Sequence, residues 1–209
     1  MPKVKNLLFD LGGVIMDLDR DRCVRAFNEL GLDDADALLG VYGQQGDFLA
    51  LERGEIDADE LHRRLRPRFD HPVTDDEIDR AFDKFLIGIP RHRLEALRQL
   101  RREGYGVYLL SNTNPIMMEG FIANEFRQEG LEMADYFDGT VCSYIAKCYK
   151  PDRKIFDYTC EHCGIRPEET LFFDDSMANV DAARRLGFYA EQVPPGQEFM
   201  DILSTFSAE

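Results

Sequence analysis

The residues that decide the fold stand near the start of the chain, where Val4-Lys5-Asn6-Leu7-Leu8-Phe9 runs into Asp10-Leu11-Gly12-Gly13-Val14-Ile15. The first six residues form a short, mostly apolar run, which suits a strand covered on both faces by helices. Asp10 follows at the carboxyl end of that strand. Because ligands of open α/β sheets bind beyond the carboxyl ends of the strands, this aspartate is a candidate functional residue.

Four further apolar runs alternate with helical patterns along the chain: Val107 to Leu110, Thr140 to Cys142, Leu171 to Phe173, and Phe188 to Val193. Helices that connect parallel strands form right-handed crossovers, so the alternation predicts a doubly wound parallel α/β sheet. One helix start is explicit, since Thr74-Asp75-Asp76-Glu77 has the pattern of a capping box.

The region from about Arg20 to Phe85 interrupts this alternation. It shows no convincing strand, and its amphipathic helical stretches are broken at Gly31, Gly40, Gly43, Gly54 and Pro67. We interpret it as a helical insertion between the first and second core strands. The predicted division assigns residues 17–89 to a helical cap and residues 1–16 and 90–209 to the α/β core.

Charge and cysteine content restrict the function classes. The net charge of −15 opposes nucleic acid or an anionic membrane as a partner. No apolar run reaches the roughly 18 residues of a membrane span, and the N-terminal residues lead into a strand without a signal-peptide pattern. Five cysteines are an odd number, which favours reduced thiols and a cytoplasmic location. We expect a monomer or a weak homodimer.

Cys160-Glu161-His162-Cys163 has the spacing of half a zinc site. No second pair of ligands with matching spacing is present, and thiols three residues apart on a helix can pack as small apolar groups. We therefore interpret these cysteines as structural.

Polar residues with complementary chemistry follow the predicted strands. Ser111-Asn112 ends the second strand and Asp174-Asp175 the fourth, while Lys150 precedes the helix before the fourth strand. Together with Asp10 they should meet at one edge of the sheet. Clustered carboxylates favour Mg²⁺ as a hard counter-ion, and one carboxylate can attack phosphorus to form an aspartyl-phosphate. Ser111 and Lys150 would then hold phosphate oxygens.

Four ordered segments resemble the signature motifs of the haloacid dehalogenase superfamily: Phe9 to Ile15, Leu110 to Asn112, Lys150-Pro151 and Phe173 to Ser176. Within it, Asp10 to Ile15 and Ser111 to Asn114 are most similar to the branch of bacterial sugar-1-phosphate phosphatases. The resemblance implies a five-stranded Rossmann-like sheet with the first strand central, and a cap that closes over the site.

The same resemblance implies a role for each matched residue. Asp10 would be the nucleophile and a metal ligand, and the carbonyl of Gly12 a further ligand. Ser111 and the backbone of Asn112 would bind phosphate, Lys150 would neutralise it and orient Asp10, and Asp175 and Asp174 would bind Mg²⁺ directly or through water. A small phosphorylated metabolite, with a sugar phosphate as the expected class, would be the substrate of this phosphatase.

Gly12 departs from the family pattern, because most of its phosphatases carry a second aspartate there as general acid. Such an acid contributes about 10²- to 10⁴-fold to the rate. Three consequences stay open. The enzyme favours leaving groups that need little protonation, or a nearby residue such as Asp17 or Asp19 stands in, or the protein is a weak phosphatase or a phosphate-binding relic.

Two other functions compete with a phosphatase. A 2-haloacid dehalogenase shares the aspartate nucleophile but needs no metal, so the Asp174-Asp175 pair argues against it. A regulatory or phosphate-binding protein would hold a phosphoryl group on Asp10 without turnover, and Gly12 keeps this interpretation open. In the cap, four charged residues are in a position to touch substrate, although charge on an amphipathic helix usually forms a solvated face: Asp17, Arg20, Glu52 and Arg53.

Overall fold

The computed structural model describes residues 4–40 and 44–206. Of the predicted core, residues 1–3 and 207–209 lie outside the described residues, as does Gly43, one of the predicted breaks in the cap.

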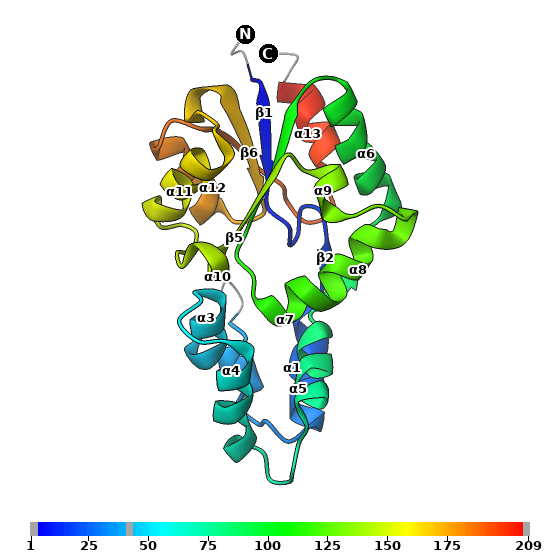
Figure 1. Ribbon diagram of the computed structural model, residues 1–209, viewed down its shortest axis with the longest axis vertical. Coiled ribbons are helices and arrows are strands. Elements are labelled where there is room, and N and C mark those ends of the chain that lie inside the picture. Colours follow the sequence, from blue (N-terminus) through cyan, green and yellow to red (C-terminus); the bar gives the residue numbers. More distant parts are fainter. Residues whose placement is uncertain (1–3, 41–43, 207–209) are drawn as a thin grey trace.

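A five-stranded parallel sheet forms the centre of the larger part of the molecule (Figure 1). Its strands run in the order β5-β4-β1-β6-β7, with β1 central as the family resemblance implies. Their bounds are β1 Asn6–Phe9, β4 Gly106–Ser111, β5 Gly139–Cys142, β6 Thr170–Asp174 and β7 Tyr189–Gln192. All five lie within two residues of the predicted runs, and the predicted doubly wound α/β fold is confirmed.

Helices cover both faces of this sheet, because the side chains of each strand alternate between two apolar cores. Leu7 and Phe9 of β1 belong to one core, and Leu8 belongs to the other. The first core packs against α6 (Arg91–Arg102) and α13 (Phe199–Phe206), and the second against α11 (Arg153–Cys163) and α12 (Met177–Arg185). Figure 1 shows the two helical layers on opposite sides of β1.

Short helical segments connect the strands at the edge where β1, β4 and β6 end. They are α7 Pro115–Met117 and a π-helical turn Met118–Ile122 after β4, and α10 Ser143–Ala146 after β5. Further along the connections lie α8 Ala123–Phe126 and a 3-10 turn Arg127–Glu129, then α9 Met133–Tyr136 before β5 and a 3-10 turn Pro167–Glu169 before β6. Cys160 and Cys163 lie on α11 and pack partly buried against the second core. The structural interpretation of these cysteines therefore agrees with their position.

Among its described residues, the region predicted as a helical insertion consists of helices joined by loops, with no strand between Arg20 and Phe85. It contains α1 Arg20–Glu29, α2 Ala35–Leu38, α3 Gly46–Glu52, α4 Ala58–Leu65, a 3-10 turn Arg66–Arg68 and α5 Asp75–Asp83. The expected capping box opens α5, with Thr74 and Glu77 bonded reciprocally. Three phenylalanines from α1, α3 and α5 pack with their rings tilted or edge to face and hold this group of helices together: Phe27, Phe48 and Phe82.

A two-stranded antiparallel ribbon stands at the base of this helical region. It pairs β2 (Asp17–Leu18) with β3 (Leu86–Gly88). Figure 1 shows α1, α3, α4 and α5 below the sheet, facing the end where the chain leaves β1. The predicted cap boundaries at 17 and 89 bracket this ribbon, and the division into two domains stays a prediction. Among the described residues, no helix is both long and apolar enough to cross a bilayer.

Candidate active site at the carboxyl edge of the sheet

The register of three neighbouring strands brings the predicted site residues to one edge. Phe9 of β1 is level with Leu109 of β4 and with Phe173 of β6. The next residue, Asp10, therefore comes beside Asp174, and its backbone N–H donates to the carbonyl of Phe173 at 2.8 Å. Ser111, the last residue of β4, is 2% exposed at the same edge. The predicted convergence of these strand ends is what the fold produces.

The ammonium group of Lys150 connects three groups at this edge of the sheet. Its ammonium nitrogen lies 2.8 Å from Oδ1 of Asp10 and 2.7 Å from Oδ2 of Asp174, and it donates to the carbonyl of Leu110 at 3.0 Å. Three acceptors match the three protons of an ammonium group. The side chain is 1% exposed. Burial lowers the pKa of Lys150, but the two carboxylates outweigh it and the net shift is upward, so the group is charged. Lys150 thus contacts Asp10, while its role in orienting Asp10 for attack and its direct contact with phosphate stay predictions.

Asp174 and Asp175 are adjacent in sequence but lie in different surroundings. Asp174 is fully buried, and besides Lys150 it accepts from the backbone of Ser176 and the side chain of Asn179, both at 2.9 Å. Asp175 is exposed on the side of the turn after β1. The sequence left open which of the two serves the lysine, and the structure assigns that role to Asp174.

Gly13 is a site residue that the sequence analysis did not single out. Its φ is +72°, and a Cβ atom there would lie 2.7 Å from Oδ2 of Asp175. Only glycine combines the left-handed backbone with this close approach. The sequence feature that indicates this residue is the pair Gly12-Gly13, which follows Asp10-Leu11.

The three carboxylates fit a divalent cation. Asp10, Asp174 and Asp175 each offer an oxygen, and these oxygens lie within 4.8 Å of one another. Burial raises the pKa of Asp10, Lys150 opposes the shift, and Asp174 and Asp175 add to it. Burial and Asp174 likewise raise the pKa of Asp175. A site that resists three negative charges favours a counter-ion, and hard oxygen ligands of this kind suit Mg²⁺.

Asn112 and Gly12 complete the predicted set. The side chain of Asn112 bridges the backbone of Lys150, accepting from its N–H at 2.9 Å and donating to its carbonyl at 3.1 Å. Asn112 therefore holds the backbone of Lys150 in place, and phosphate binding by the Asn112 backbone stays a prediction. A Cβ atom on Gly12 would lie 2.7 Å from Cδ1 of Leu18, so the turn is tightly packed against β2. Metal binding by the carbonyl of Gly12 also stays a prediction.

The two aspartates proposed as stand-in acids have other partners. Asp17 accepts from Arg93 at 2.8 Å, and Arg93 also binds the carboxylate of Glu198. Asp19 is the N-cap of α1 and accepts from the backbone of Arg22 at 3.0 Å. These contacts tie Asp17 to the core and Asp19 to its own helix, and a role for either as stand-in acid stays a prediction.

The other charged residues of the cap divide into two kinds. Arg20 binds the carbonyls of Leu39 and Asp36, which is a structural role within the helical region. Glu52, at the end of α3, is 6% exposed and faces the hydroxyl of Tyr149, while the Arg53 guanidinium lies 5.8 Å from the centre of the Tyr149 ring. A solvated helix face is therefore the wrong description for Glu52.

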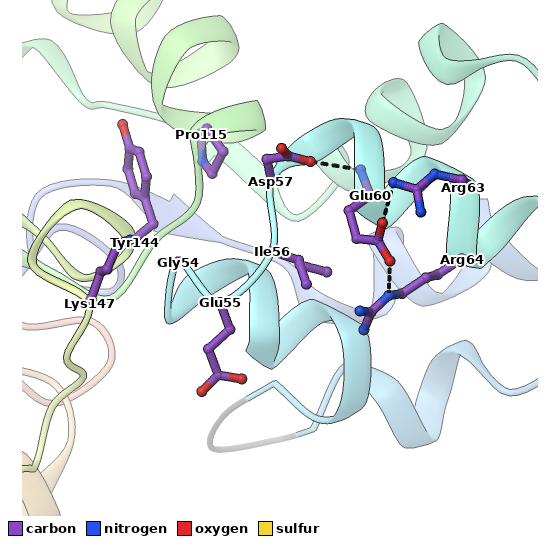
Figure 2. Close-up of a pocket in the computed structure, with 10 residues that line it drawn as sticks. All are labelled: Gly54, Glu55, Ile56, Asp57, Glu60, Arg63, Arg64, Pro115, Tyr144 and Lys147. Atoms are coloured by element: carbon purple, nitrogen blue, oxygen red, sulfur yellow. Dashed lines mark hydrogen bonds and ion pairs between the residues drawn. The ribbon is translucent and has the colours of Figure 1, made fainter.

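A cleft of about 780 Å³ lies along the junction between the helical region and the core. Figure 2 shows the loop after α3, with Gly54 to Asp57, on one side and Pro115, Tyr144 and Lys147 on the other. Asp10 and its carboxylate neighbours are not among the lining residues. The cleft therefore marks where the cap meets the core and is distinct from the carboxylate cluster.

A parallel α/β core with a strand-end aspartate, a buried lysine and an acidic pair defines a class of hydrolase that works through a carboxylate. Comparison with known proteins agrees, since the model of the haloacid dehalogenase-like hydrolase family matches residues 4–187. The chain belongs to that family, as the sequence motifs predicted.

Full-length relatives support this assignment. The chain is 39% identical over 201 residues to the D-ribitol-5-phosphate phosphatase of Bacteroides thetaiotaomicron, covering 96% of this chain and 97% of that one. A crystal structure of a haloacid dehalogenase family enzyme from the same organism, a point mutant in complex with magnesium and inorganic phosphate, matches with a TM-score of 0.91 at 38% identity and covers 96% and 98% of the two chains. A predicted haloacid dehalogenase-like hydrolase from Porphyromonas gingivalis matches with a TM-score of 0.90 at 32% identity over 99% of both.

Proposed function

We propose that this protein is a Mg²⁺-dependent phosphomonoester hydrolase that acts on a small sugar or polyol phosphate through an aspartyl-phosphate on Asp10. The observation that carries the proposal is the geometry of Lys150, which holds Asp10 at 2.8 Å beside two carboxylates whose oxygens are close enough to share one cation. The expected enzyme class, a phosphatase of this family, and the expected Mg²⁺ are confirmed at the level of the relatives.

Different residues of this chain carry out the steps of such a reaction. Asp10 attacks phosphorus, and the bond to the leaving oxygen breaks. Lys150 keeps the Asp10 carboxylate oriented and, with Ser111, offsets the negative charge of the transferring phosphoryl group. A magnesium ion held by Asp10, Asp174 and Asp175 would supply charge neutralisation for the phosphate oxygens. Water then attacks the aspartyl-phosphate and releases inorganic phosphate.

The substrate class rests on similarity to a named relative. The relative with 97% of its length covered is named for ribitol 5-phosphate, a small polyol phosphate. Substrate choice between sugar and polyol phosphates, and between ring and open-chain forms, is part of the proposal and needs a substrate screen. A cytoplasmic location, the absence of nucleic-acid and membrane partners, and a monomer or weak homodimer stay predictions.

The first experiment is phosphate release from an aryl phosphate with Mg²⁺ and after its removal by a chelator. The test variant is Asp10→Asn, and the matched control is Asp181→Asn, which changes an exposed aspartate on α12. We expect Mg²⁺-dependent release in the wild type and the control, and none above background in Asp10→Asn. Release that persists without Mg²⁺, or in Asp10→Asn, would refute the proposal.

The same purified protein also serves to distinguish a phosphatase from the two competing functions. Halide release from a 2-haloacid that is independent of Mg²⁺ would favour a dehalogenase over a phosphatase. A phosphorylated Asp10 that survives for minutes after exposure to a reactive phosphoryl donor would favour the regulatory interpretation. Rapid decay of that species, with one phosphate released for each turnover, is the result we expect.

A further inference from the structure

The leaving-group oxygen needs a proton donor that Gly12 cannot supply. Alkoxides are poor leaving groups, so an alkyl phosphate of the sugar or polyol kind gains most from a general acid. Asp17 and Asp19 are engaged by Arg93 and by the backbone of α1. A donor that is not already engaged in this way would come from another side chain near Asp10.

Glu52 is a buried carboxyl group at the junction between the cap and the core. It is the last residue of α3, it is 6% exposed, and it lies against the hydroxyl of Tyr149. Its Oε2 atom is buried and has no hydrogen-bond partner among the residues that the structure describes. Buried polar atoms are nearly always paired, so an unpaired one calls for a functional explanation.

Tyr149 connects Glu52 to the nucleophile's surroundings. It precedes Lys150, which contacts Asp10, and its hydroxyl also interacts with the side chain of Asn112. Burial raises the pKa of Tyr149, as do the neighbouring carboxyl of Glu52 and the charge of Asp10, so the phenol lies within electrostatic range of both carboxyl groups. Tyr149 thus lies near Glu52 of the cap region and near Asp10 of the core.

The closed position of the cap holds Glu52 there. A Cβ atom on Gly54, two residues further on, would lie 2.1 Å from the carbonyl oxygen of Tyr144 on α10. The backbone of the loop after α3 is therefore in direct contact with the core. Arg53 adds a cation–π contact with the ring of Tyr149 at 5.8 Å. Three consecutive residues, Glu52 to Gly54, thus anchor the cap beside the catalytic lysine.

The protonation state of Glu52 matches the role of an acid. Burial raises its pKa to about 8, with Tyr149 acting in the opposite direction. At neutral pH the group is mostly a neutral carboxylic acid, which can donate a proton where an ionised one cannot. A general acid works best with a pKa close to the pH at which the enzyme operates.

We propose that Glu52 is the general acid and base of this enzyme, donating a proton from the cap to the leaving oxygen of the substrate. The inference rests on the proposed phosphatase function. In the first step Asp10 forms a bond to phosphorus, the bond from phosphorus to the leaving oxygen breaks, and that oxygen takes the proton of Glu52 to become an alcohol. In the second step the Glu52 carboxylate takes a proton from the attacking water, and the bond between Asp10 and phosphorus breaks.

The dependence on the leaving group tests this role. We would compare wild type, Glu52→Gln and Glu55→Gln on a nitrophenyl phosphate, whose leaving group needs no proton, and on a polyol phosphate with a primary alcohol leaving group. Glu55 is the matched control, because it is an exposed glutamate on the same loop. We expect Glu52→Gln to lose about 10²- to 10⁴-fold in kcat on the polyol phosphate and less than about 10-fold on the nitrophenyl phosphate. Glu55→Gln should resemble wild type on both.

The outcomes separate a catalytic role from a structural one. An equal loss on both substrates, or no loss on the polyol phosphate, would overturn the assignment. Glu52→Asp, which keeps the acid on a shorter side chain, should recover part of the loss on the polyol phosphate alone. Nitrophenyl phosphate turnover by the wild type tests the phosphatase function itself, so a failure there is distinct from a failure of Glu52.

Discussion

The ammonium group of Lys150 and the carboxylate of Asp174 form an ion pair of 2.7 Å in which the two side chains are 1% and 0% exposed. A buried pair of this kind contributes to the fold as well as to the chemistry, because removal of one partner strands the other charge in the interior. Loss of the lysine also releases Asp10 from its orienting contact.

We therefore expect Lys150→Met to abolish phosphate release and to lower the free energy of unfolding by about 3–5 kcal/mol. Chemical denaturation at neutral pH measures the second effect. Lys5→Met is the control, since it breaks the exposed pair with Glu169 and should leave both stability and turnover near wild type. A Lys150→Met protein as stable as the control would contradict the structural role.

Mg²⁺ should stabilise the folded protein through the acidic cluster. A ligand that binds only the folded state at about 100 times its Kd adds about 2.7 kcal/mol to stability. We expect Mg²⁺ to raise the Tm of the wild type and of Asp181→Asn, and to raise that of Asp175→Asn much less. Without Mg²⁺, Asp175→Asn should be more stable than wild type, because one repelling carboxylate is removed. An unchanged Mg²⁺ shift in Asp175→Asn would remove Asp175 from the metal site.

Gly54 offers a test of cap closure with a matched control. Its φ is +64° and that of Gly164 is +66°, so alanine meets the same backbone strain at both positions. At Gly164 nothing lies within 4 Å of a Cβ atom, whereas at Gly54 the Tyr144 carbonyl lies 2.1 Å away. We expect Gly54→Ala to reduce kcat/KM at least about 10-fold by lifting the loop from the core, since a misplacement of about 1 Å costs up to 10²-fold. Gly164→Ala should lose only stability, and equal activity in the two variants would disprove the cap contact.

Glu52 should make the stability of the protein depend on pH. Its pKa is raised from 4.5 in the unfolded chain to about 8 in the folded state, so the folded state binds the extra proton between these values. Stability contributed by this neutral form is complete below about pH 4.5 and is lost as the pH rises towards 8, by at most about 1.4 kcal/mol per pH unit. Glu52→Gln removes this dependence.

The free energy of unfolding of Glu52→Gln relative to wild type should therefore increase between pH 5.5 and pH 8. Urea denaturation at both pH values measures the difference, with Glu55→Gln as the reference. Parallel pH dependences in Glu52→Gln and wild type would show that the Glu52 carboxyl is ionised in the folded protein.

Much of the fold was predictable from local patterns. Buried strands of a parallel sheet leave short runs of apolar residues, and Leu7, Leu8 and Phe9 supply both cores from consecutive positions. Because parallel strands all end at one edge, the residue after such a run has a known place in space. For that reason the sequence alone predicts that Asp10, Ser111 and Asp174 lie at the same edge of the sheet.

The contacts across the junction between cap and core were not predictable in the same way. Glu52 ends an amphipathic helix, and its sequence neighbours give no sign that Tyr149, ninety-odd positions away, covers it. The choice between Asp174 and Asp175 likewise depends on which of two adjacent side chains points towards the buried lysine.

The sequence by itself thus determined the sheet, from the periodicity of its apolar runs, and the family, from the four ordered motifs at the strand ends. It also placed Asp10 and the acidic pair at one edge, because parallel strands end together. Only the tertiary structure decided that Lys150 contacts Asp10, Asp174 and the carbonyl of Leu110, and that Glu52 is buried, which raises its pKa. The physical reason is that burial and charge coupling depend on distances between segments far apart in the chain, and a one-dimensional pattern does not contain those distances.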